Sequence, residues 1–215
     1  MNFGELQTQV LNKIDYNDQS TKVPTYINSA IHILEDEEDW SHMENKATGN
    51  LTTSVDYIAI PTRYKNSKSL FVTDDTEQKE VHIGEYSAII REYPWGSNSK
   101  SLPKRFAEKY SESNFIVRPY PDKTYAWEML TNVFSADLSA DADSNWWTAN
   151  KWEIVLYGAL IQYELDSGQQ LKLGTEEMPL SPMILYQGML TILKKSMKRR
   201  KYTKGIAYSR ASYVV

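Results

Sequence analysis

The sequence predicts an α+β fold: a helical bundle of two N-terminal and two C-terminal helices, with an inserted antiparallel β domain and an extended C-terminal arm. Apolar residues recur at helical spacing near both ends of the chain and alternate at strand spacing in its middle third. The last ten residues are rich in β-forming side chains and contain no turn to fold them back. The expected domains are a helical hairpin at 1–50, the β domain at 51–140, a helical pair at 141–201 and the arm at 202–215.

Two helices are expected near the N-terminus, packed together as the hairpin. Apolar residues at steps of three and four mark the first helix at about residues 3–15, and a second apolar stripe runs over Val23–Leu34 behind a Ser20 or Thr21 cap. The second helix ends in the acidic run Glu35–Asp39, which opposes the helix dipole. We interpret this run as a solvated acidic face, with a docking surface for a basic neighbour as the alternative.

The middle of the chain is expected to form strands, because β-branched and aromatic runs are broken there by turn-forming clusters. The expected strands are Thr53–Ile60, Ser69–Val72, Glu80–Ile83, Arg105–Tyr110, Asn114–Arg118 and Thr124–Val133. The last three are expected to form an antiparallel meander. Residues 87–95 fit either a short helix or an irregular crossing.

The C-terminal half of the bundle is expected to contain a third and a fourth helix. A cap within Asp143–Asn145 begins the third helix, and Gly168 ends it. Ser181–Pro182 is a cap and first-turn pair for the fourth helix, which should run to about Lys201.

The third helix carries apolar side chains on more than one side, which favours burial of its aromatic face against a neighbouring subunit. A glycine inside a helix costs about 1 kcal/mol relative to alanine, so close packing is expected at its glycine. That packing could lie between subunits or inside one subunit. The candidate subunit-packing residues are Trp146, Trp147, Trp152, Tyr157 and Gly158.

The formal net charge of -4 conceals a strong asymmetry along the chain. From residue 194 onward there are eight basic residues and no acidic one, which leaves 16 basic against 28 acidic residues in the rest. The basic residues are Lys194, Lys195, Lys198, Arg199, Arg200, Lys201, Lys204 and Arg210. Such a segment is typical of an arm that binds an acidic partner.

Motifs for chemistry are absent from the sequence. The chain has no cysteine, its three histidines lie at no recognised metal-ligand spacing, and it lacks the glycine-rich motifs of nucleotide and acyl-transfer enzymes. Asp137, Asp141 and Asp143 alternate as in a calcium loop but lack its glycine and terminal glutamate, so we interpret them as a polar loop that supplies a helix cap. No catalytic residue, cofactor, metal site, signal peptide or membrane span is predicted.

The entrance of the third helix reads Asp141-Ala142-Asp143-Ser144-Asn145-Trp146-Trp147, and Leu156-Tyr157-Gly158-Ala159-Leu160 follows it. These motifs, and the order of the expected elements over nearly the whole chain, resemble the phage head-to-tail adaptor family. Family members commonly pair an Asn-Trp-Leu entrance with a Leu-Tyr-Gly-Ala-Leu core, and Trp147 replaces the leucine here. A second departure is the acidic run Glu35–Asp39, since relatives often have a basic end to that helix.

The resemblance implies a non-enzymatic virion protein, made in the host cytoplasm, that forms a dodecameric ring between the portal and a downstream tail or tail-ring protein. The segment 194–215 is then the expected portal-binding arm, with its basic residues joined by Ile206, Tyr208, Tyr213 and Val214. Its last residues would add a strand to a sheet edge of the portal. Loops of the β domain at 74–77 and 96–99 would meet tail components, and incidental contact with packaged DNA is possible.

Two other functions stay open from the residues alone. A basic-armed nucleic-acid-binding module would bind through Lys198–Lys204 with a steep salt dependence. A carboxylate hydrolase would need a concave pocket with two carboxylates of divergent pKa. Neither has a sequence motif behind it.

Overall fold

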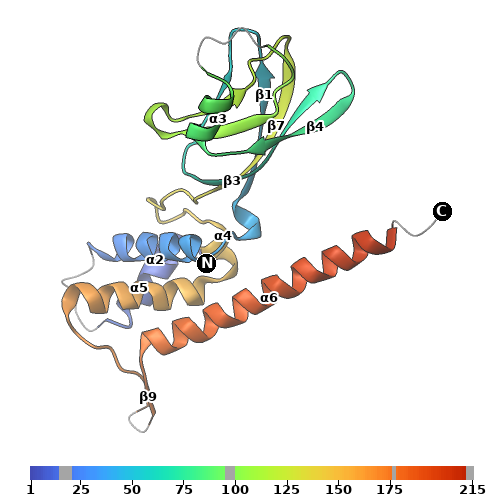
Figure 1. The fold of residues 1–215 in the computed structure, drawn as a ribbon. Helices are drawn as coiled ribbons and strands as arrows, with labels where there is room; N and C mark the ends of the chain where they lie inside the picture. Colours follow the sequence, from blue (N-terminus) through green and yellow to red (C-terminus); the bar gives the residue numbers. More distant parts are fainter. Residues whose placement is uncertain (15–20, 95–99, 176–177, 212–215) are drawn as a thin grey trace. The chain divides into compact units, whose positions relative to one another are not determined.

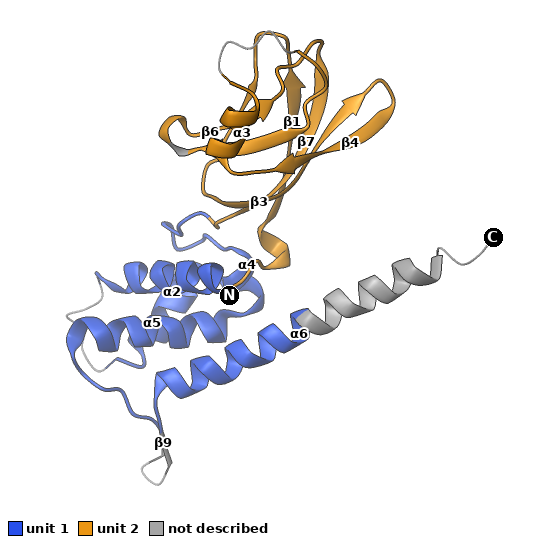
Figure 2. Ribbon diagram, in the orientation of Figure 1, with its two compact units in different colours: residues 1–37, 136–215 blue, residues 38–135 orange. Residues whose placement is uncertain are grey.

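The computed structural model describes residues 1–14, 21–94, 100–175 and 178–211, and Figure 1 shows the fold. The chain divides into two compact units (Figure 2). The helical unit consists of Met1–Glu37 together with Ala136–Val215, and the sheet unit is Glu38–Ser135. The sheet unit is therefore an insertion between the second helix and the rest of the helical unit.

The helical unit is organised around one central helix. Its helices are α1 (Phe3–Leu11), α2 (Val23–Glu37), α4 (Trp146–Asn150), α5 (Trp152–Ser167) and α6 (Pro182–Ala211), and the short strands β8 (Leu173–Thr175) and β9 (Met178–Leu180) form a hairpin before α6. α5 packs against α2 most extensively, then against α6 and α1. Eight of its 16 residues are buried, since neighbours cover it on several sides.

Local signals in the sequence explain where these helices begin and end. Asn145 caps α4 in a capping box with Thr148, whose backbone N–H donates to the Asn145 Oδ1 at 3.1 Å. The expected third helix is broken at Lys151, so it forms the two helices α4 and α5. Gly168 ends α5 in the left-handed conformation, with φ of 69°.

The sheet unit contains seven strands in the order β1-β7-β3-β4-β5-β6-β2. Their bounds are β1 (Glu44–Leu51), β2 (Tyr57–Ala59), β3 (Tyr64–Asp74), β4 (Glu77–Ile83), β5 (Arg105–Lys109), β6 (Asn114–Arg118) and β7 (Tyr125–Val133). Helix α3 (Tyr86–Glu92) and 3-10 turns at Ser41–Met43 and Tyr110–Glu112 complete the unit. The inward side chains form one apolar core, which includes Leu70, Phe106, Phe115, Tyr125 and Met129.

The predicted fold class was wrong. The sheet is mixed, because β4 pairs with β5 in parallel while the other strands pair antiparallel. It is also nearly closed into a barrel. Within the described residues the strands are about as numerous as the helices. The N-terminus is the single short helix α1 instead of a two-helix hairpin, because the apolar stripe of α2 is used mainly against α5.

The expected extended C-terminal arm was wrong as well. The backbone of α6 stays helical to Ala211, since no proline follows Pro182 and each of its two glycines costs a helix only about 1 kcal/mol. The expected meander also fails at β7, which pairs with β1 and β3 and not with β6. The segment left open at 87–95 contains the helix α3.

Candidate functional site

The aromatic entrance to α5 belongs to the core of the helical unit. Trp147 is fully buried, and its indole Nε1 donates a hydrogen bond to the Oε1 of Glu35 at 2.9 Å. Glu35 on α2 is buried too, so the interpretation of the acidic run as a solvated face was wrong at this residue. Because Trp147 is enclosed by its own chain, it cannot provide the subunit contact that the sequence suggested.

The other predicted subunit-packing residues lie in different environments. Trp146 is 37% exposed and stacks edge-on against Trp147, with ring centroids 5.2 Å apart. Trp152 and Tyr157 are half-buried. Trp146 is therefore the most exposed of these three aromatic side chains, although most of its surface is covered.

Gly158 explains the close approach of α2 to α5. A Cβ at this position would lie 2.9 Å from the Cβ of Ala30, a distance that real Cβ atoms do not adopt. The tight contact expected at Gly158 therefore lies inside one chain. Tyr186 of α6 packs at the same place, and burial, followed by the charge of Glu37, raises the pKa of its phenol to about 12.

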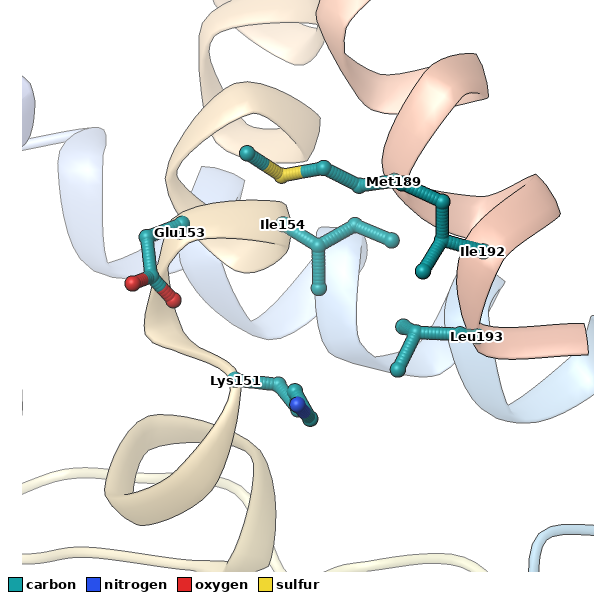
Figure 3. A pocket seen from close by; sticks show the side chains of 6 residues that line it. All are labelled: Lys151, Glu153, Ile154, Met189, Ile192 and Leu193. Atoms are coloured by element: carbon teal, nitrogen blue, oxygen red, sulfur yellow. The ribbon is translucent and has the colours of Figure 1, made fainter. Parts of the chain in front are cut away.

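The α6 helix exposes several large apolar side chains along its described part. Met183 is 43% exposed, Ile184 59% and Ile192 68%. Figure 3 shows a cavity of about 210 Å³ between the α4–α5 junction and α6, in which Ile154, Met189, Ile192 and Leu193 are flanked by Lys151 and Glu153. This volume suits a single side chain from a partner, because cofactor sites are usually larger than about 300 Å³.

The predicted portal-binding residues are only partly described. The Nζ of Lys194 lies 2.7 Å from the Oε2 of Glu37, so this lysine is paired with the acidic end of its own α2. Lys195 is exposed on the next position of α6. The side chains of Lys198, Arg199, Arg200, Lys201, Lys204, Ile206, Tyr208 and Arg210, and the residues Tyr213 and Val214, lie outside the described part of the structure.

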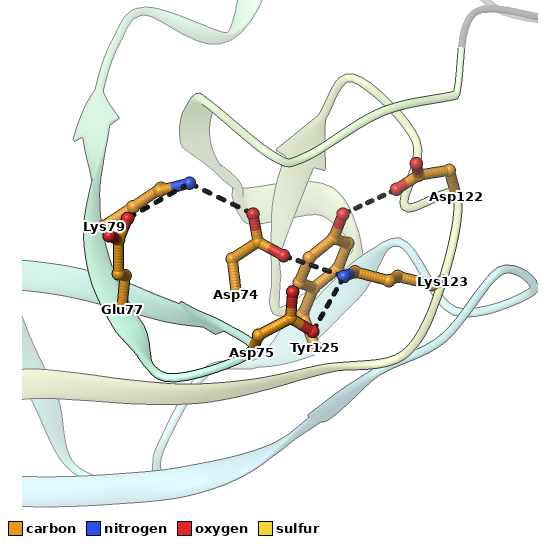
Figure 4. Close-up of polar contacts among 7 residues, drawn as sticks. All are labelled: Asp74, Asp75, Glu77, Lys79, Asp122, Lys123 and Tyr125. Atoms are coloured by element: carbon orange, nitrogen blue, oxygen red, sulfur yellow. Dashed lines mark hydrogen bonds and ion pairs between the residues drawn. The ribbon is translucent and has the colours of Figure 1, made fainter.

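The sheet unit carries a charged cluster where the β3–β4 turn meets the turn before β7 (Figure 4). The carboxylate of Asp74 accepts from Lys79 at 3.0 Å and lies 2.8 Å from Lys123, which also pairs with Asp75 at 3.2 Å. Hydrogen bonds from Lys123 and then Lys79 lower the pKa of Asp74. These contacts tie two exposed turns together, which favours a fixed shape at this end of the sheet. The second predicted tail-contact loop, 96–99, lies outside the described residues.

The remaining polar candidates have structural partners. His32 Nε2 lies 2.7 Å from Asp137 Oδ1, and the carboxylate of Asp143 accepts from the backbone N–H groups of Ser139 and Ala140 at 2.9 and 2.8 Å. Those backbone donors lower the pKa of Asp143. No group of three His, Asp or Glu side chains suited to a metal ion occurs among the described residues. In the same residues, no helix is both long enough and apolar enough to cross a membrane.

Comparison with known proteins identifies the family of this chain. The family described as SU10 adaptor protein matches residues 1–199, which is nearly the whole chain. The chain belongs to the SU10 adaptor protein family. This is a family of phage head–tail adaptors, so the chain is a structural protein of a bacteriophage virion that interacts with other head and tail proteins. No curated protein matches the chain.

Two residues on the surface of this SU10 adaptor protein were not predicted as interface candidates from the sequence. Ile33 of α2 is 41% exposed because it lies off the buried face of that helix, and Gly188 of α6 has open space where its Cβ would be. The glycine could have been noticed, because a glycine inside a helix needs a packing reason.

Proposed function

We propose that this SU10 adaptor protein assembles as a dodecameric ring that joins the portal to the downstream tail protein of a tailed phage, without catalysis. The observation that carries the proposal is the surface of the helical unit, where apolar side chains stay exposed on α2, α4, α5 and α6. Exposed apolar surface of this kind is a feature of protein interfaces. Six of the eight large apolar side chains that are exposed among the described residues belong to helices of this unit, which favours a repeated contact between copies.

The charge distribution supports a second contact, with the portal. Outside α6, the helical unit has 14 acidic and four basic residues, whereas α6 has eight basic and no acidic residue. All eight cations lie between Lys194 and Arg210, so the first turns of the helix carry no basic residue. We therefore propose Lys194–Val215 as the portal-binding segment, acting as a basic helix through Ala211 instead of as an added strand.

The sheet unit is the proposed tail-facing part. Its turn at Asp74–Glu77 is exposed at the tip but held at its base by Lys79 and Lys123. Loops fixed on a rigid scaffold are common recognition elements. The charged cluster would give the tail protein a surface of defined shape without a large ordering cost.

Binding to purified portal particles tests the portal contact. The triple variant Lys198→Gln, Arg199→Gln and Arg200→Gln should lose at least tenfold in affinity, and wild-type binding should weaken as salt rises because exposed charges are screened. The matched control is Arg91→Gln, Lys100→Gln and Lys104→Gln, which removes the same charge from exposed positions of the sheet unit.

Co-sedimentation at 50 and 300 mM salt measures both effects. Equal portal affinity of the two triple variants would overturn the portal-binding assignment. Light scattering of the portal-bound protein separately counts the copies, and a stoichiometry that is not twelve would overturn the dodecamer. A preference of the basic segment for duplex DNA over portal particles would favour the nucleic-acid-binding module instead.

A further inference from the structure

Two exposed helix faces of the helical unit each carry a ridge of three side chains at the same spacing. On α2, Thr25, Ser29 and Ile33 form a ridge at i, i+4 and i+8, with Ser29 half-buried and Ile33 41% exposed. On α6, Ile184, Gly188 and Ile192 form a ridge at the same spacing, with the two isoleucines 59% and 68% exposed. Each ridge therefore has a small residue at its centre.

The small residue of the α6 ridge has no partner in its own chain. Apart from its chain neighbours and the adjacent backbone of α6, no heavy atom of the described residues lies within 4 Å of the Cβ that Gly188 would carry. Gly158 is a contrast, since Ala30 of the same chain packs directly against it. An exposed glycine in a helix costs about 1 kcal/mol relative to alanine, and nothing inside the described chain offsets that cost.

The two ridges also carry opposite charges at the same distance from the small residue. Exposed Asp36 lies seven positions after Ser29, and exposed Lys195 lies seven positions after Gly188. Parallel packing of the two helices would bring Ser29 to Gly188, Ile33 to Ile192 and Asp36 to Lys195. The pairing Lys194–Glu37 inside the chain shows that cations of α6 and carboxylates of α2 already associate in this unit.

We infer that the α6 ridge of one copy docks in parallel on the α2 ridge of a neighbouring copy, with Ser29 against Gly188 at the closest approach. The inference rests on the proposed ring, for which it names the contact. Ridges at i±4 spacing interlock in the commonest mode of helix packing, and small residues bring the two backbones close. The complementary charges identify a second copy as the occupant, because the two partners are faces of the same unit.

The contact joins two different faces, so it is heterologous. Each copy that uses its α6 ridge still offers a free α2 ridge to the next copy, and repetition of the contact closes a ring when the rotation permits. A self-complementary pairing of two α6 ridges would stop at a dimer and would place Lys195 of each copy near the other basic helix.

Engineered disulfides test the contact directly, because the chain has no cysteine of its own. The double variant Ser29→Cys with Gly188→Cys should give a ladder of covalent oligomers when portal-bound assemblies are oxidised and analysed without reductant. A disulfide needs a Cβ–Cβ distance of about 3.8 Å, and nothing in the described chain lies that close to position 188. The crosslink would therefore join different copies. Each single variant should give no species larger than a dimer.

The direction of packing has a matched control. The pair Thr25→Cys with Ile184→Cys should crosslink, whereas Thr25→Cys with Ile192→Cys should crosslink at least tenfold less, because position 192 is two turns, about 12 Å, farther along the helix. The reverse preference would mean antiparallel packing and would overturn the proposed register. In a separate readout, Lys195→Glu and Asp36→Lys should each lower the yield of the Ser29–Gly188 crosslink, and their combination should restore it.

Light scattering of the same samples separates the two levels of the proposal. If the variants form assemblies of several copies and none of the cysteine pairs crosslinks, the contact inferred here is wrong while the ring stands. If wild-type protein stays monomeric both alone and on portal particles, the ring and the contact are both wrong.

Discussion

The two units of this protein differ in how completely they bury their large apolar side chains. Eight large apolar side chains are strongly exposed among the described residues, and six of them belong to the helical unit. These six are Ile33, Trp146, Leu165, Met183, Ile184 and Ile192, whereas the sheet unit contributes only Tyr57 and Ile83. Exposed apolar surface is typical of protein interfaces, so we expect the helical unit, more than the sheet unit, to provide contacts between copies.

The physical reason lies in the closure of each unit. A nearly closed sheet pairs most of its backbone groups and encloses its inward apolar side chains, while α3 covers a second, smaller apolar cluster. One edge strand, β2, has only three residues, which limits pairing with foreign strands. A layer of helices has no such closure, so the outward ridges of α2 and α6 remain available.

The most damaging change should be the loss of the buried tryptophan of the helical unit. Trp147→Ala is expected to lower the free energy of unfolding by about 3–5 kcal/mol, because it leaves a large cavity and removes the indole donor from buried Glu35. Chemical denaturation followed by helical circular dichroism measures the loss. Trp146→Ala is the matched control and should cost less than about 1.5 kcal/mol, since Trp146 is 37% exposed. Similar losses in the two variants would contradict the division between core and surface.

Two glycines in the same unit should respond to alanine with opposite signs. Gly158→Ala is expected to destabilise the chain by about 1 kcal/mol or more, because overpacking against Ala30 exceeds the gain in helix propensity. Gly188→Ala should stabilise the isolated chain by about 1 kcal/mol, since its Cβ enters open space.

Thermal unfolding of the monomer and assembly on portal particles together test this pair. The Gly188→Ala variant should unfold at a higher temperature and assemble less well, because the added methyl group separates the two ridges. A variant that is more stable and assembles normally would show that the glycine serves no contact.

Local features of this structure could be predicted from the sequence, and features that depend on distant residues could not. The helix cap expected within Asp143–Asn145 is at Asn145, and the stop at Gly168 and the strand Asn114–Arg118 were confirmed, since each depends on a few adjacent side chains. The burial of Glu35 was missed because its partner Trp147 lies 112 positions away. The parallel pairing of β4 with β5 was missed for the same reason.

The C-terminal segment shows a different limit. Its composition favours strand locally, but the segment continues a helix that has already formed, and propagation of a helix costs less than nucleation. For the candidate interface residues, the sequence named positions on the expected third helix but did not show which of their side chains are exposed. Trp147 was a candidate for subunit packing and is buried inside its own chain, while the exposed residues Ile33 and Ile192 were not singled out.

Polar substitution of exposed apolar residues should impair assembly more in the helical unit than in the sheet unit. Ile184→Ser with Ile192→Ser is expected to reduce assembly on portal particles about tenfold, because apolar area is lost from the proposed contact. Tyr57→Ser with Ile83→Ser removes similarly exposed side chains from the sheet unit and should change assembly less than twofold. Sedimentation of the assembled protein gives both values, and an equal loss in the two variants would remove the distinction between the units.

The smallest expected effects concern the folding stability of each unit at acid pH. Hydrogen bonds from Lys22 and then Tyr26 lower the pKa of Asp166 in the helical unit, and those from Lys123 and then Lys79 lower the pKa of Asp74 in the sheet unit. A carboxylate whose folded-state pKa is lowered contributes stability above its unfolded pKa of about 3.9, and loses it as pH falls through the folded pKa. Both units should therefore lose stability slightly below about pH 4.

The two carboxylates differ in how many cations hold them, which decides the size of the change. Lys22→Gln leaves Asp166 with the phenol of Tyr26 alone, whereas Lys123→Gln leaves Asp74 still paired with Lys79 at 3.0 Å. The pKa of Asp166 should therefore rise more in the first variant than the pKa of Asp74 rises in the second. NMR titration of the two carboxyl groups measures both shifts, with Lys46→Gln as a control that removes a cation from the separate pair with Glu128. A larger shift at Asp74 would mean that Lys79 does not hold this turn, and the case for a rigid tail-facing surface would lose its main support.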